Sequence, residues 1–86
     1  MHTVELMHHA VDLAERAGYE IREEWLGGSG GGGCEVRGQK LMFLDLALGP
    51  AEQLDAFVET LRHDAEAQQL PMPHPLRELL TVRRSA

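Results

Sequence analysis

Residues Gly27 to Gly33 read Gly-Gly-Ser-Gly-Gly-Gly-Gly and separate two strand-like stretches. Glycine loses more backbone entropy on ordering than any other residue, so six glycines in seven positions would destabilise an ordinary loop. A folded chain keeps such a segment for one of two reasons. Either the segment is never ordered, or another group needs close contact with a backbone that carries no side chains. We expect this loop to be ordered and to lie near Asp45.

The size and charge of the chain narrow the classes of protein it can belong to. A chain of 86 residues has room for one domain with a modest core. Fourteen acidic against eight basic residues give a net charge of −6, which argues against nucleic acid as a partner. A single cysteine, no membrane-length apolar run and no signal-peptide pattern indicate a cytoplasmic protein with no membrane partner.

Hydrophobic periodicity predicts the elements on either side of the loop. We expect an amphipathic helix, three strands and a second helix, at residues 3–17, 19–26, 34–37, 40–48 and 50–69 respectively. Gly38-Gln39 suits a type II′ hairpin turn, and this register pairs Cys34 with Phe43 and Gly32 with Asp45.

These elements predict an α+β fold, a two-layer α/β sandwich in the order α-β-β-β-α. The three strands are expected to form an antiparallel meander, with two helices on one face. Residues 1–70 are expected to form the domain. Residues 71–86 are expected to form a proline-rich C-terminal extension, with a short helix at residues 76–82.

The glycine loop and Asp45 are the candidate binding residues. The stretch from Gly28 matches G-x-G-x-x-G, but the dinucleotide fingerprint needs a helix next, and a strand follows here. Asp45 interrupts a strand that is apolar on both faces, so its carboxylate needs partners. One interpretation is a clamp held by glycine N–H groups, and the other makes Asp45 a cation ligand or general base. The residues assigned to the ligand-binding hypothesis are Gly28, Gly30, Gly31, Gly32, Gly33 and Asp45.

The remaining polar residues do not complete a catalytic or metal motif. Cys34 is interpreted as a small buried hydrophobic residue. His8 and Asp12 have a spacing that can hold zinc, and His63 or His74 could be a third ligand. Histidines that are simply exposed to solvent account for the same residues. We therefore expect no catalytic residue, no metal and no cofactor.

The pattern from Gly27 to Gln53, GGxGGGxCxxxGxxxxxxDL followed by xxxxxEQ, resembles small uncharacterised bacterial proteins. The order of helix, strands and "E-Q" before a helix is also similar to the minimal core of zinc metallopeptidases of the IrrE/ImmA type. In that family this last helix carries H-E-x-x-H. Here Glu59 and His63 are present but out of register, so the resemblance does not carry over a zinc site.

The function predicted from these observations is a small non-enzymatic interaction module that forms a homodimer. Two helices on one sheet face leave apolar side chains outward, either Met42, Leu44, Leu46 and Leu48 or Leu41, Phe43 and Ala47. We expect a second copy to cover that face, with the C-terminal segment contributing. The alternatives are a small-ligand or anion-binding protein that uses the loop and Asp45, and a degenerate metal-dependent hydrolase.

Overall fold

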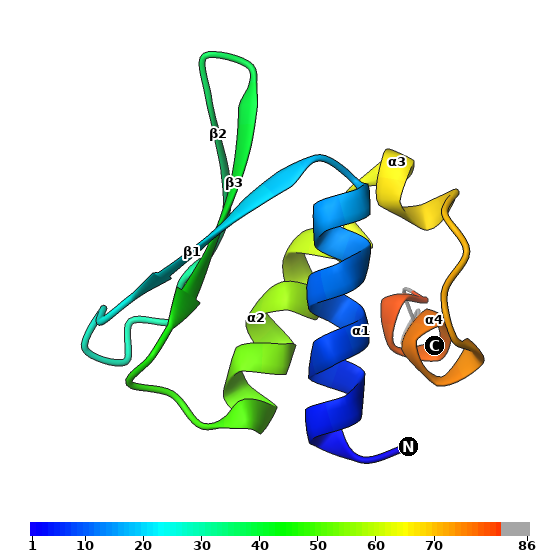
Figure 1. The fold of residues 1–86 in the computed structure, drawn as a ribbon, viewed down its shortest axis with the longest axis horizontal. Helices are drawn as coiled ribbons and strands as arrows, with labels where there is room; N and C mark the ends of the chain where they lie inside the picture. The colour runs from blue at the N-terminus through cyan, green and yellow to red at the C-terminus, as the bar shows by residue number, and fades with distance from the viewer. Residues whose placement is uncertain (82–86) are drawn as a thin grey trace, which may run out of the picture.

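A layer of helices packs on one face of a three-stranded sheet in the computed structural model, which describes residues 1–81 (Figure 1). In chain order the elements are α1 (Thr3–Arg16), β1 (Tyr19–Glu24), β2 (Gly32–Val36), β3 (Gln39–Asp45), α2 (Pro50–Arg62), α3 (Ala65–Gln68) and α4 (His74–Leu80). The α+β class predicted from the sequence is confirmed. Val82, the last residue of the helix predicted at 76–82, and the rest of the C-terminal extension after it lie outside the described residues. Within residues 1–81 no helix has the length and apolarity needed to cross a membrane.

The sheet is mixed, with strand order β1-β3-β2. β3 runs parallel to β1 and antiparallel to β2, so the antiparallel meander expected for all three strands is corrected for β1. The apolar run in β3 suits the central place, where both edges of the strand are paired and one face packs against the helices. β1 carries Glu20, Glu23 and Glu24, and charged residues of this kind are typical of an edge strand.

The β2–β3 hairpin turns one residue earlier than the glycine pattern predicts. Arg37 and Gly38 occupy the turn with φ of 52° and 81°, the left-handed conformation that a type I′ turn needs at both positions. Gly32 therefore pairs with Phe43 and Cys34 with Leu41, a register two residues from the expected one. Because the shift is even, each side chain stays on the face expected for it.

The inner face of the sheet and the helices share one core. Met42 is 0% exposed, and Ile21 and Leu44 on the same face pack against the core. Each helix contributes a buried stripe with helical spacing. The fully buried side chains from the helices include Leu13, Phe57, Leu61, Leu76 and Leu80.

The second helical segment breaks at His63-Asp64 instead of running on to residue 69. The Asp64 side chain accepts a hydrogen bond from the backbone N–H of Ala67 at 3.1 Å and so caps α3. A chain segment that contains Pro71 and Pro73 then leads to α4. The guanidinium of Arg77 holds the carbonyls of Gln68 and Leu70 at 3.1 and 2.9 Å. α4 therefore packs against α1 and α2, on the side of these helices opposite to the sheet (Figure 1).

Candidate functional site

The glycine loop is ordered around the carboxylate of Asp45, as predicted. Oδ1 of Asp45 accepts the backbone N–H groups of Leu26 and Ala47 at 3.1 and 2.9 Å, and Oδ2 accepts that of Gly30 at 3.1 Å. Asp45 is 1% exposed. The amides of this loop therefore form an anion-binding nest, and the anion that occupies it is the chain's own carboxylate.

The same contacts set the charge state of Asp45. Burial by itself would raise the pKa of this carboxyl group. Hydrogen bonds from the N–H groups of Ala47, Gly30, Leu26 and Gly28 outweigh that effect, and the pKa of Asp45 lies below its ordinary value. The carboxylate is ionised at neutral pH and acts as a clamp between the end of β3 and the loop.

Two glycines are required for close approach of the backbone. Gly31 has φ of 66°, and a Cβ there would overlap the carbonyl oxygen of Phe43. At Gly33 a Cβ would overlap Cγ2 of Thr60 on α2, and the N–H of Gly33 donates to Thr60 Oγ1 at 2.9 Å. The bare backbone thus lets the start of β2 lie between β3 and α2.

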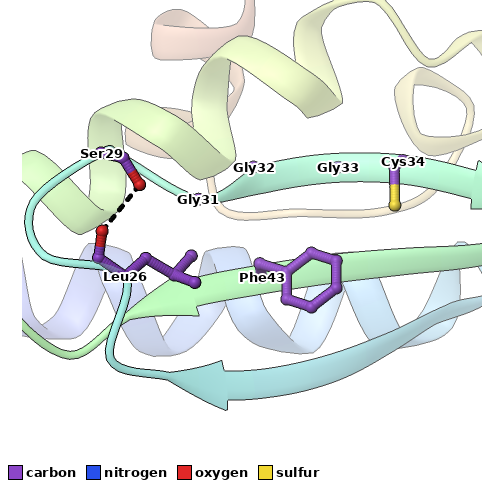
Figure 2. Close-up of a pocket in the computed structure, with 7 residues that line it drawn as sticks. All are labelled: Leu26, Ser29, Gly31, Gly32, Gly33, Cys34 and Phe43. Carbon is purple, nitrogen blue, oxygen red and sulfur yellow. Dashed lines mark hydrogen bonds between the residues drawn. The ribbon is translucent and has the colours of Figure 1, made fainter.

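The structure divides the predicted binding residues into two groups. Gly28, Gly30 and Asp45 meet inside the loop, where the carboxylate is surrounded by amides. The other group, Gly31, Gly32 and Gly33, lines a shallow pocket of about 360 Å³ together with Leu26, Ser29, Cys34 and Phe43 (Figure 2). Asp45 is not among the residues that line this pocket, so the geometry supports the clamp interpretation of Asp45.

The pocket belongs to the outer face of the sheet, which we define by the strand positions that point away from the core. These are Glu20 and Arg22 on β1, Gln39, Leu41 and Phe43 on β3, and Gly32, Cys34 and Val36 on β2. In Figure 2 the side chains of Leu26 and Phe43 lie beside each other in front of the sheet, with α1 behind it. No element within residues 1–81 covers this face.

Cys34 is exposed on this face, so the expectation of a buried cysteine is wrong. The pattern places Cys34 correctly on the same face as Val36 and Phe43, although its partner across the strands is Leu41, but burial on that face would need a second layer. Among residues 1–81 no group of three or more His, Cys, Asp or Glu side chains is arranged to hold a metal ion. His63 instead contacts Glu59 at 3.2 Å, and His74 contacts Glu78 at 3.4 Å, each one helical turn away.

A second cluster of charged residues has no counterpart in the sequence analysis. Asp64 Oδ2 lies 2.6 Å from the hydroxyl of Tyr19 and 2.9 Å from Nζ of Lys40. Lys40 Nζ also donates to the carbonyl of Ala17 at 2.9 Å and to Glu66 at 3.1 Å, and it lies 4.9 Å from the centre of the Tyr19 ring. The cluster fastens the starts of β1 and β3 to the junction of α2 and α3.

We expect the melting temperature to fall as pH rises from about 10 to about 12. Burial, followed by the hydrogen bond to Asp64, raises the pKa of Tyr19 from 10.0 to about 12. A group whose pKa is raised on folding stabilises the folded state below its unfolded pKa, and this contribution is lost as pH rises through the folded pKa. The hydrogen bond to Asp64 also raises the pKa of Lys40, which acts in the same direction.

Thermal unfolding followed by circular dichroism in this pH range measures the effect, with Tyr19→Phe as the matched control. The variant keeps the ring under Lys40 but lacks the titrating hydroxyl, so its melting temperature should fall less steeply. Identical slopes for the two proteins would show that Tyr19 makes no contribution to the alkaline limit.

The fold and the site define a two-layer α+β domain with a glycine loop closed over a buried aspartate. Comparisons with models of known protein families, with curated proteins and with solved structures give no match to this chain. The resemblance to small bacterial proteins and to the IrrE/ImmA-type core therefore stays a prediction.

Proposed function

We propose that this protein is a non-enzymatic interaction module that binds a protein partner through the outer face of its sheet. The observation that carries the proposal is the position of Leu41 and Phe43 on the central strand, on a face that no element of residues 1–81 covers. Leu41 and Phe43 are half-buried and Val36 on the same face is exposed, so together they leave apolar surface open to a partner, as interaction sites do.

The surroundings of these two side chains support the same function. Val36 is 51% exposed, and Cys34, which lines the pocket, is also exposed. Trp25 is 75% exposed and directly precedes Leu26, which lines the pocket. Aromatic residues are enriched at protein interfaces, and Phe43 in the pocket and the exposed Trp25 next to Leu26 in the chain are residues of this kind.

The geometry gives less support to the two alternative functions. An anion-binding role would need N–H groups that face a ligand, but those of Gly30 in the loop, Leu26 before it and Ala47 after β3 donate to Asp45. A hydrolase would need a nucleophile or a metal beside a base, and the outer face offers Cys34 beside leucine and phenylalanine. The pocket is better suited to an apolar side chain of a partner.

Photocrosslinking tests the proposal. p-Benzoylphenylalanine introduced in place of Val36 reports on the outer face, and the same group in place of the exposed Glu52 on α2 is the matched control. In cells that express the chain, we expect a discrete adduct from position 36 and none from position 52. Excess unlabelled protein should compete for that adduct, whereas a Cys34→Asp variant, which places a charge on the face, should not. Equal labelling from both positions would contradict the proposal.

A further inference from the structure

We infer that the partner of the outer face is a second copy of this chain, placed across a two-fold axis so that Arg22 of each copy meets the partner's Glu20. This inference rests on the proposed function and specifies its partner. A two-fold interface is isologous, so a patch that forms one must be complementary to itself in both charge and shape. The outer face has both properties in one register.

The side chains of the outer face lie in rows across the sheet. One row contains Glu20, Leu41 and Cys34, and the next contains Arg22, Phe43 and Gly32. Consider a two-fold axis that lies parallel to the sheet, runs across the strands and passes midway between the two rows. Rotation about this axis brings the two outer faces together and places the first row of one copy over the second row of the other. Leu41 then meets the partner's Phe43, and Cys34 lies over the partner's Gly32, which lines the pocket.

The charges at the β1 edge select the same register. Arg22 Nη1 lies 3.1 Å from Glu20 in the same chain, and both side chains are about half exposed. A guanidinium has five N–H donors, and this contact uses one of them. In the register that stacks Leu41 on Phe43, each Arg22 faces the partner's carboxylate at position 20, so two further ion pairs form symmetrically.

The other registers lose one of these matches. An axis through the row of Arg22 opposes arginine with arginine across the interface. An axis one row towards the glycine loop opposes Phe43 with the end of β3, where the outward position is occupied by the buried Asp45 under its loop. Of these positions, the axis between the two rows is therefore the one that both buries Leu41 against Phe43 and pairs Arg22 with Glu20.

The size of the face determines the expected affinity. Three strands spaced ~4.8 Å apart, each about six residues long, give a flat footprint of roughly 300 Å². This is well below the roughly 800 Å² per partner of a standard interface. We therefore expect a reversible dimer with a dissociation constant of about 10–100 µM.

Sedimentation equilibrium of the full chain from about 5 to about 500 µM spans that range. Glu20→Arg and Arg22→Glu should each weaken the homodimer by about tenfold, because each change opposes like charges twice across the axis. An equimolar mixture of the two variants should form a heterodimer more tightly than either variant associates with itself, and salt should weaken that heterodimer. The double variant Glu20→Arg/Arg22→Glu should restore self-association.

The mixture distinguishes contacts between chains from the pair within one chain, since neither single variant keeps its internal pair. Unchanged melting temperatures show that the variants remain folded. Dimerisation of the wild type without any preference in the mixture would overturn the register while leaving the outer face as the interface. A wild-type chain that stays monomeric while position 36 crosslinks to a different protein would overturn self-association and leave the proposed function standing. A monomer with no adduct at position 36 would overturn both.

Discussion

Replacing Gly31 with alanine is expected to lower the free energy of unfolding by about 2–5 kcal/mol, a large fraction of the stability of a small domain. The new Cβ would overlap the carbonyl oxygen of Phe43, a backbone atom that cannot move without distorting β3. The residue would also have to keep φ of 66°, a conformation that is unfavourable for alanine by about 1–2 kcal/mol. Urea unfolding followed by circular dichroism measures the change.

Gly27→Ala is the matched control for this variant. Gly27 also has φ of 66°, but a Cβ there has no heavy atom within 4 Å. The control therefore retains the backbone strain and lacks the overlap, and we expect it to lose about 1–2 kcal/mol. Equal losses for Gly27→Ala and Gly31→Ala would show that contact with Phe43 does not restrict position 31.

Asp45→Ala is expected to lower the melting temperature by about 10 °C or more, because buried N–H groups of the loop lose their acceptor. Leu26, Gly30 and Ala47 donate to this carboxylate, and the chain reverses direction at each side of it. We also expect amide hydrogens of residues 26–31 to exchange faster in the variant, since the loop is held from its centre. Hydrogen exchange followed by mass spectrometry measures this local effect.

Asp45→Asn separates shape from charge at the same position. The amide has one acceptor oxygen, so one side of the nest would face an NH2 group, and we expect an intermediate loss. The pKa of Asp45 is lowered on folding, so its charge stabilises the fold above its unfolded pKa, and that stabilisation is lost as pH falls through the folded pKa. The asparagine variant should therefore show a weaker loss of stability below about pH 4 than the wild type. An unchanged melting temperature for both variants at neutral pH would contradict the clamp.

The sequence determined the local structure and the relation between the loop and Asp45. The periods of 3.6 and 2 located α1, β1, β3 and the start of α2 to within a few residues, because these patterns reflect one buried face. An aspartate in an apolar strand needs hydrogen-bond donors, and a nearby run of glycines supplies bare amides. The expected pairing of Gly32 with Asp45, on which the prediction rested, is two residues from the observed one, but the loop does lie beside Asp45 because Gly30 donates to its carboxylate.

The β2–β3 hairpin shows why the position of a short turn is difficult to predict from the amino-acid sequence. Gly38 can occupy either central position of a tight turn, and the chain uses the second, with Arg37 in the left-handed region. In the observed register β2 ends its pairing at Phe43, which leaves the carboxylate of Asp45 free to accept the loop amides. The position of the turn thus depends on contacts at the far end of the hairpin.

Only the tertiary structure decided the strand order, the path of the C-terminal segment and the cluster of Tyr19, Lys40 and Asp64. Tyr19 and Asp64 are 45 residues apart, and neither has a local pattern that identifies its partner. β3 takes the centre because burying its apolar run against two neighbours outweighs the simpler antiparallel path from β1 to β2. α4 packs on α1 and α2 because Leu76 and Leu80 are buried there, and this leaves the outer face of the sheet uncovered. Periodicity shows that a face is apolar, but which surface covers that face depends on the summed packing of distant elements.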